Sequence, residues 1–236
     1  MSRIFEALTD ASQQRSTADT ELQSHHNLPA PATAEYLFLR ERILRLTPDL
    51  NQRTLLFASP SSDKGSLGIV TNFCLTLSEA GNKVLLVGIN MDESFMRQKF
   101  GVSRVPEITE VLSGRRSIGE FTHKTIYRNL SLLSGDMLLT NPLSPEESRM
   151  LQTAIDDMKS VTDWIIFGWP PAHLINSSTG SVQIVDGTAL IVEADKTGRG
   201  AARRAREHLE KGGANILGAI LSNPKNYVPR WINRWL

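Results

Sequence analysis

The residues with the clearest chemical potential follow the first predicted strand, between Leu55 and Asn72. An apolar run ends in a loop of small and polar residues that starts at Ser59, and a helical pattern begins near Gly65. A strand, a small-residue loop and a helix N-terminus in this order are typical of a phosphate-binding loop, in which backbone N–H groups hold the anion. The side chains depart from that chemistry, since the motif needs Gly-Lys-Ser/Thr and this chain has Lys64-Gly65-Ser66-Leu67.

Two interpretations of this loop are open. Lys64 and the main-chain amides around Gly65 would form a weakened phosphate site, or the segment is an ordinary turn between a strand and a helix. We favour the turn, because a cationic side chain on the wrong face of a tight loop is not easily redirected toward a phosphate.

The composition fits one large domain, or one domain with an extension. Hydrophobic residues make up 40% of the 236 residues, and the net charge of +1 gives no general reason to expect nucleic acid. Cys74 is the only cysteine, which excludes an intramolecular disulfide. No apolar stretch reaches the length of a membrane span, and the N-terminus lacks a signal-peptide pattern. The sequence therefore predicts a soluble cytoplasmic protein.

The chain divides at about residue 32. Residues 1–32 are predicted to form a short N-terminal helix and a flexible linker, and residues 33–236 an α/β domain. The apolar residues Ile4, Phe5 and Leu8 share one face of the helix predicted over 2–12. A helix this short is marginal alone, so it is either a docking peptide for a partner or an end that packs on its own domain.

The domain alternates apolar strands with amphipathic helices. Strands are predicted at 54–58, 83–89, 130–133, 164–167, 188–193 and 216–221. Helices are predicted at 34–46, 68–79, 108–112, 145–160 and 198–211. This alternation predicts a doubly wound, mostly parallel sheet with helices on both faces.

From Ala34 to the C-terminus the order of these features resembles the cytoplasmic domain of the bacterial tyrosine kinases of capsule and exopolysaccharide synthesis (BY-kinases). That family belongs to the P-loop ATPases with a deviant Walker A motif. The N-terminal Met-Ser-Arg-Ile-Phe-Glu-Ala-Leu is similar to the start of its stand-alone members. Further segments carry the resemblance: 58–72, 84–94, 114–135, 163–171, 185–197 and 227–236.

The resemblance implies a nucleotide site whose working side chains are absent. An alignment without gaps puts Ser66 at the position of the phosphate-binding lysine and Leu67 at that of the Mg²⁺-binding hydroxyl. The family's acidic pair falls on Gly88 and Asn90, and its Walker B carboxylate falls on Gly168. We therefore predict no catalytic residue and no metal ligand. The remaining candidate nucleotide positions, all degenerate, are Ser59, Lys64, Gly65, Ser66 and Leu67.

The resemblance also bears on two neighbouring acids, on the phosphoacceptor and on the ring interface. Asp92 and Glu93 could supply the missing carboxylates from a position further along the chain. We favour the interpretation that they belong to a solvated turn. The chain has no C-terminal tyrosine cluster. The family's ring interface carries Glu-x-x-Arg-x-x-Arg, of which only the last position, Arg40, is matched.

The C-terminal residues Arg230, Trp231 and Trp235 combine aromatic and basic side chains. This composition suits a membrane headgroup region or a protein groove. A final turn packed on the domain is slightly favoured.

These observations predict a catalytically degenerate BY-kinase-like protein. It would bind or regulate a membrane-bound chain-length or export protein in exopolysaccharide biosynthesis, at the inner face of the membrane through that partner. It would form a homo-oligomer or an oligomer with an active relative, and bind no nucleic acid. No cofactor is expected. ATP and Mg²⁺ enter only in the alternative, an active kinase or ATPase that uses Lys64 and Asp92. A partition or septum-positioning ATPase relative is the second alternative.

Overall fold

The structure is a computed structural model of the chain. It describes residues 30–49, 53–60, 65–89, 91–112, 123–135, 144–175 and 182–222. The predictions made for residues 2–12, Lys64, Asn90 and the C-terminal tail from Arg230 therefore lie outside the described residues. Among the helices that are described, none is both long enough and apolar enough to cross a bilayer.

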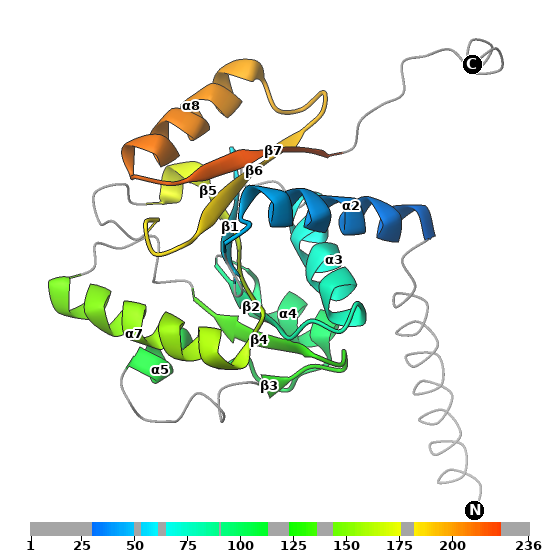
Figure 1. Cartoon of the computed structure of the whole chain (residues 1–236), viewed down its shortest axis with the longest axis vertical. Coiled ribbons are helices and arrows are strands. Elements are labelled where there is room, and N and C mark those ends of the chain that lie inside the picture. Colours follow the sequence, from blue (N-terminus) through cyan, green and yellow to red (C-terminus); the bar gives the residue numbers. More distant parts are fainter. Residues whose placement is uncertain are drawn as a thin grey trace, which may run out of the picture.

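A seven-stranded sheet runs through the middle of the domain in the order β3-β4-β2-β5-β1-β6-β7 (Figure 1). The strands are β1 Arg53–Ser59, β2 Val84–Gly88, β3 His123–Lys124, β4 Leu130–Ser134, β5 Trp164–Pro171, β6 Gly187–Glu193 and β7 Ile216–Ser222. All neighbouring strands are parallel except β3, which pairs antiparallel with β4. The predicted mostly parallel sheet is confirmed.

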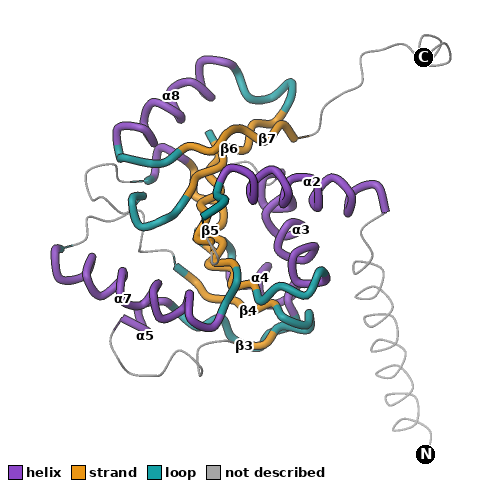
Figure 2. The backbone as a smooth tube through the Cα atoms, viewed as in Figure 1, coloured by secondary structure: helices purple, strands orange, loops and turns teal. Residues whose placement is uncertain are grey.

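Helices cover both faces of this sheet (Figures 1 and 2). One face carries α2 Ala30–Leu46, α3 Gly65–Glu79 and α4 Glu93–Phe100. The other carries α5 Ile108–Leu112, α7 Pro145–Val161, the 3-10 turn η1 Ala172–Leu174 and α8 Arg199–Lys211. Two separate hydrophobic clusters fill the two interfaces, so the predicted doubly wound architecture is confirmed.

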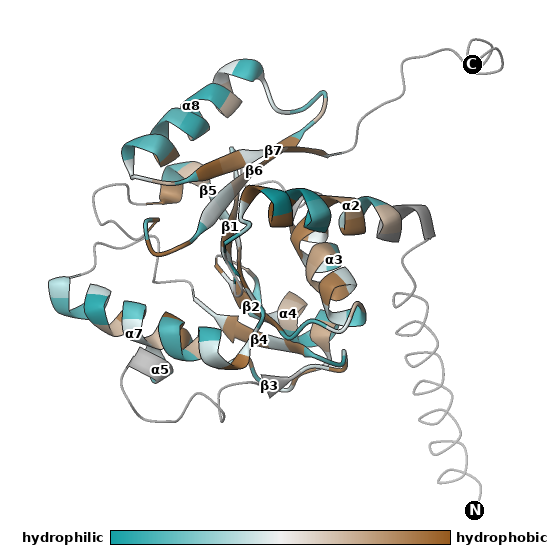
Figure 3. Ribbon diagram, viewed as in Figure 1, coloured by the Kyte–Doolittle hydropathy of each residue, from teal (hydrophilic) through white to brown (hydrophobic). Residues whose placement is uncertain are grey.

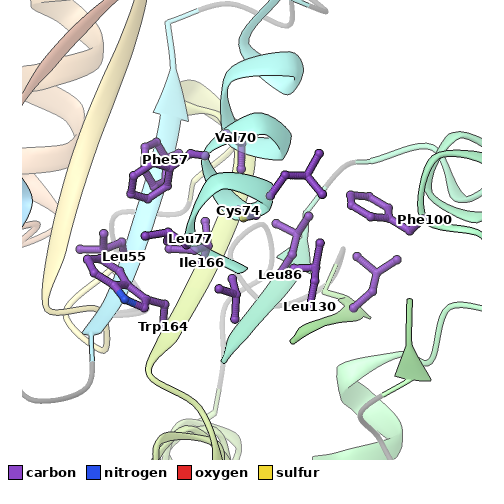
Figure 4. Close-up of a cluster of buried hydrophobic side chains, with 14 of the residues drawn as sticks. Leu55, Phe57, Val70, Cys74, Leu77, Leu86, Phe100, Leu130, Trp164 and Ile166 are labelled. Carbon is purple, nitrogen blue, oxygen red and sulfur yellow. The ribbon is translucent and has the colours of Figure 1, made fainter. Parts of the chain in front are cut away.

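The cluster under α3 shows why the central strands are apolar throughout (Figure 4). Phe73 of α3 lies between Phe57 of β1 and Trp164 of β5, with ring centroids 5.4 Å and 6.1 Å away. Cys74 and Leu77 follow on the same helix and are fully buried. A strand that is covered by helices on both faces has no solvent side, and hence no polar alternation.

Each strand and helix predicted for residues 33–236 is present in the described part of the chain, with ends that shift by a few residues. The main difference is α4, which sequence reasoning treated as a solvated turn after Asp92. Asp92 is instead the N-cap of this helix and accepts a hydrogen bond from the Phe95 N–H over 2.8 Å, while Gly101 ends it with φ 64°. A cap residue followed by a glycine eight residues after the helix starts is a signal that predicts such a helix.

Helix α7 begins with a capping box formed by Ser144 and Glu147, and this contact gives a prediction about pH. Ser144 accepts from the Glu147 N–H at 3.2 Å, and the Glu147 carboxylate accepts from the Ser144 N–H at 2.7 Å. Hydrogen bonds from the Ser144 backbone and then its side chain lower the pKa of Glu147 from 4.5. A lowered folded-state pKa means that the stabilisation is present above the unfolded pKa and is lost as pH falls through the folded one.

We therefore expect amide protection in the first turn of α7 to decline on acidification below about pH 4.5, the ordinary glutamate value. Hydrogen exchange followed by mass spectrometry measures this directly. Glu147→Gln is expected to remove that decline. Equal acid sensitivity in both proteins would contradict the assignment.

Candidate functional site

The carboxyl ends of β1, β5 and β2 meet at one edge of the sheet, where the degenerate positions lie. Within the parallel pairs, Gly168 stands opposite Phe57 of β1 on one side and opposite Gly88 of β2 on the other. Ser59 is buried at the end of β1 and pairs with Pro171. The fold therefore brings Ser59, Gly88 and Gly168 together, as the resemblance implies.

Helix α3 begins beside these strand ends. Its first residue is Gly65, and Ser66 and Leu67 follow within its first turn. Leu67 is half-buried and packs against the hydrophobic cluster between α3 and the sheet. Leu67, which the resemblance aligns with the Mg²⁺-binding hydroxyl, is thus an apolar side chain packed against the core.

Two methionines fill the space next to the glycines. A Cβ atom built at Gly168 would lie 2.9 Å from Met91 Cε, 3.1 Å from Val70 Cγ1 and 3.2 Å from Leu86 Cδ1. A Cβ atom at Gly88 would lie 2.7 Å from Met96 Sδ and 2.9 Å from Met91 Sδ. Met91 is 4% exposed and Met96 is fully buried.

This packing decides what the site can hold. Distances under 3.0 Å mean that a neighbouring atom must move before even a methyl group fits, and a carboxylate needs more room and hydrogen-bond donors. A flexible thioether end moves more easily than backbone, but here both thioethers are enclosed. The region therefore offers apolar sulfur-containing side chains where a metal-binding carboxylate would have to stand.

Sequence reasoning missed Met91 and Met96. Both come from the segment that was treated as a turn, and their only sequence signal is apolar spacing around the Asp92 cap. Their place over the two glycines depends on how α4 packs against the sheet, which the sequence alone does not give.

The described titratable groups include a few that are buried or that lie close to this edge. In the part of the chain that the structure describes, no group of three His, Cys, Asp or Glu side chains is placed to hold a metal ion. His173 is exposed in η1. Glu193 is buried at the end of β6, where its carboxylate pairs with Lys196 at 2.6 Å. Burial raises the pKa of the Cys74 thiol, which is enclosed in the core.

Charged residues on the surface helices α2 and α8 pair with neighbouring acids. Arg40 is half-buried on α2 and pairs with Glu41 at 2.9 Å. On α8, Arg203 pairs with Glu207 at 3.7 Å and Arg206 with Glu210 at 3.5 Å. The outer sides of α7 and α8 are mainly hydrophilic (Figure 3). The basic run on α8 is therefore a solvated face that is partly neutralised by its own acids.

Comparison with known proteins agrees with the resemblance to bacterial tyrosine kinases. No protein-family model matches the chain. The chain is 26% identical over 177 residues to tyrosine-protein kinase CpsD of Streptococcus agalactiae, which covers 75% of this chain and 77% of CpsD. It is 22% identical over 198 residues to the putative tyrosine-protein kinase CapB of Staphylococcus aureus, covering 84% and 87% of the two chains.

Solved structures show the same relationship in three dimensions. The kinase domain of Escherichia coli tyrosine kinase ETK matches with a TM-score of 0.65 and 15% identity, over 84% of this chain and 79% of that one. The chimerical protein CapA2B2 matches with a TM-score of 0.64 and 18% identity, over 80% and 84%. A MinC–MinD cell division complex from Aquifex aeolicus scores 0.58 with 19% identity, over 72% and 68%. In sequence this chain is similar to bacterial tyrosine-protein kinases, and its fold is that of their kinase domains and of the MinD type of P-loop ATPase.

Proposed function

We propose that the chain is a catalytically degenerate relative of the bacterial tyrosine kinases, which acts as a binding or regulatory partner in exopolysaccharide biosynthesis and export. The observation that carries the proposal is the packing of Met91 against Gly168. Where the family's Walker B carboxylate would begin, this chain has a buried thioether methyl 2.9 Å from the Cβ position.

The chemistry of phosphoryl transfer explains why this substitution matters. The reaction relies almost entirely on positioning and on charge stabilisation by Mg²⁺ and cationic side chains. With Ser66 and Leu67 in the loop, glycines at 88 and 168 and an asparagine at 90, the chain lacks the lysine, the hydroxyl and all three carboxylates at the matched positions. Substituting only one of these would weaken catalysis, and the combination leaves no ligand set for the metal.

ATP titration of the purified chain, with and without Mg²⁺, tests the proposal. We expect no micromolar Mg²⁺-dependent binding, no turnover of isotope-labelled ATP and no tyrosine phosphorylation. CpsD of Streptococcus agalactiae, assayed in parallel, serves as the positive control. Micromolar Mg²⁺-dependent binding or autophosphorylation would overturn the proposal.

A reversion series sharpens the same test. Ser66→Lys with Leu67→Thr restores the two loop side chains but not the acids. We expect this variant to recover phosphate binding at most, in the millimolar range, and no ATP turnover above that of the unmodified chain. ATP turnover by the double variant would show that the acids are not needed and would contradict the proposed role of Gly88 and Gly168.

The alternative of an active divergent kinase is favoured by one observation, the names of the sequence relatives. It would use Lys64 and Asp92. The Asp92 carboxylate already accepts hydrogen bonds from the Phe95 N–H and the Ser94 hydroxyl at the start of α4, and a capping role opposes a metal-binding one. The likeness to MinD, at 19% identity, concerns the fold alone.

The partner we propose is a membrane-bound chain-length or export protein, which would hold the chain at the inner face of the membrane. Oligomers with a second copy or with an active relative belong to the same proposal. Affinity capture from the source cell, with mass spectrometry of the bound proteins, tests it. A parallel capture with residues 229–236 deleted tests whether Arg230, Trp231 and Trp235 contribute. Recovery of no polysaccharide-export protein and no related kinase would contradict this role.

A further inference from the structure

The outer edge of β7 is an open end of the sheet. β7 is the last strand in the order β3-β4-β2-β5-β1-β6-β7, and within the described residues no segment pairs with its outer side. Figure 1 shows the strand at the margin of the sheet. Native sheets usually protect such an edge with a lysine, a proline or a covering element. The strand reads Ile-Leu-Gly-Ala-Ile-Leu-Ser and contains neither a charge nor a proline.

The hydrogen bonds to β6 decide which backbone groups of β7 stay open. The Ser222 carbonyl accepts from the Ala194 N–H at 2.9 Å, so the backbone groups of Ser222 point inward toward β6. These directions alternate along a strand with a period of two, and the pairing with β6 is regular from Gly218 to Ser222. Ala219 and Leu221 therefore point their N–H and C=O groups outward. Both residues are exposed.

The side chains of these two residues lie on the face of the sheet that α8 covers. Ala219 stands opposite Leu190 and Leu221 stands opposite Val192, and both of these partners pack in the cluster on the α8 side. Ile220, between them, packs against the cluster on the other face. Leu221 is 58% exposed. The edge thus offers an apolar side chain next to open backbone groups.

A second copy of the chain fits this edge, because the edge is complementary to itself. A two-fold axis perpendicular to the sheet brings two β7 strands together antiparallel. With the axis at Ile220, Ala219 of each copy stands opposite Leu221 of the other, and the outward N–H and C=O groups of each pair bond to one another. Each exposed leucine then lies beside an alanine, whose small side chain leaves room for it.

The neighbouring registers fit less well. With the axis at Ala219, Leu221 would stand opposite Leu217, but Leu217 packs against the cluster on the other face of the sheet. With the axis at Leu221, Ala219 would face a residue beyond the end of β7, and its pair of hydrogen bonds would be lost. The axis at Ile220 therefore uses the open backbone groups and the side chains together.

Helix α8 is compatible with this arrangement. It contacts both η1 and β7, and on the η1 side His208 Nε2 lies 2.6 Å from the Ile175 carbonyl. Arg206 and Glu210 lie about 200° around the helix from His208, on the side toward β7. They pair with each other at 3.5 Å. The axis sets the two α8 helices antiparallel on one face of the joined sheet, where this flank offers its neighbour both signs of charge.

We propose that two copies of the chain join β7 to β7 in antiparallel orientation, with the axis at Ile220, and so form one continuous sheet. The proposal rests on the second-copy oligomer of the proposed function and gives it a surface. Self-association is measured without ATP and without a partner protein. Its absence would therefore leave the results of ATP titration and affinity capture unchanged.

Sedimentation equilibrium of the full-length chain tests the dimer. We expect Leu221→Lys to raise the dissociation constant of the dimer at least about tenfold, because a charge on an edge strand opposes pairing with a second strand. Val161→Lys on α7 is the matched control, since Val161 is also an exposed apolar residue and lies away from β7. It is expected to leave the dissociation constant unchanged. An unmodified chain that stays monomeric, or equal dissociation constants for Leu221→Lys and the unmodified chain, would overturn the proposal.

Cysteine pairing tests the register, because the native Cys74 is buried and burial raises the pKa of its thiol. Ala219→Cys and Leu221→Cys are mixed, equilibrated and oxidised. We expect disulfide-linked dimers in the mixture and not in either variant alone, since only opposite residues reach the Cα separation of about 5.5 Å that a disulfide needs. Val161→Cys mixed with either variant controls for random collision. Equal yields in the mixture and in the single variants would contradict the axis at Ile220.

Discussion

Gly168→Asp is expected to lower the free energy of unfolding by about 4 kcal/mol, the upper range for single substitutions that bury an unpaired charge. The new Cβ alone would approach Met91 Cε to 2.9 Å and Val70 Cγ1 to 3.1 Å. The carboxylate would extend further into the cluster that contains Leu86 and Ile166. In an active kinase of the family that the chain resembles, this position is expected to be acidic, so the result would distinguish this chain from such a kinase.

The same substitution at a different glycine provides the control. Gly198 is the N-cap of α8, with extended backbone, no side-chain cap and no atom within 4 Å of a built Cβ. Gly198→Asp is expected to stabilise the domain by about 0.5 kcal/mol, through a capping hydrogen bond and the favourable interaction of a negative charge with a helix N-terminus. Urea denaturation of both variants measures the difference between their free energies of unfolding.

A shorter side chain at Met91 is expected to offset part of the destabilisation caused by Gly168→Asp. Met91→Ala alone removes a buried side chain and is expected to cost about 2–3 kcal/mol. The double variant is expected to be at least about 1 kcal/mol more stable than the sum of the two single effects predicts, since the alanine leaves room for the carboxylate. Strict additivity would show that Met91 does not occupy the space of the missing acid.

Asp186→Ala is expected to destabilise the domain by about 3 kcal/mol, the cost of leaving a buried N–H group and a lysine without their acceptor. The Asp186 carboxylate accepts from the buried Thr54 N–H at 2.7 Å and from Lys159 Nζ at 3.3 Å. It thereby joins the start of β1 and the end of α7 to the turn that precedes β6. Asp186→Asn keeps an acceptor for Thr54 and should lose only about 1 kcal/mol.

Asp157→Ala is the matched control for this experiment. Asp157 is exposed on α7, and its substitution is expected to change stability by less than about 0.5 kcal/mol. Denaturant midpoints at neutral pH give the comparison. If Asp186→Ala behaved like Asp157→Ala, the carboxylate would not be the group that holds the start of β1.

The elements of this fold were largely predictable because their signals are local. Apolar runs bounded by turn residues predicted six of the strands, and the helix predicted at 145–160 corresponds to α7. The exceptions are short. The β3 strand has two residues, and the α4 helix has eight. Elements of this size are stabilised by contacts with the rest of the domain, and not by their own sequence.

The sequence by itself determined which side chains are present, and so the proposal that the lysine, the hydroxyl and the acids are missing at the positions 66, 67, 88 and 168, where the resemblance aligns them. It also determined the alternation that gives a doubly wound sheet. Only the tertiary structure decided what packs beside Gly168, since Met91 reaches it across 77 positions of the chain. The same holds for Asp186, which bonds to Thr54 over a separation of 132 residues. Close packing in the interior depends on all neighbouring side chains at once. A local sequence pattern therefore does not predict these contacts.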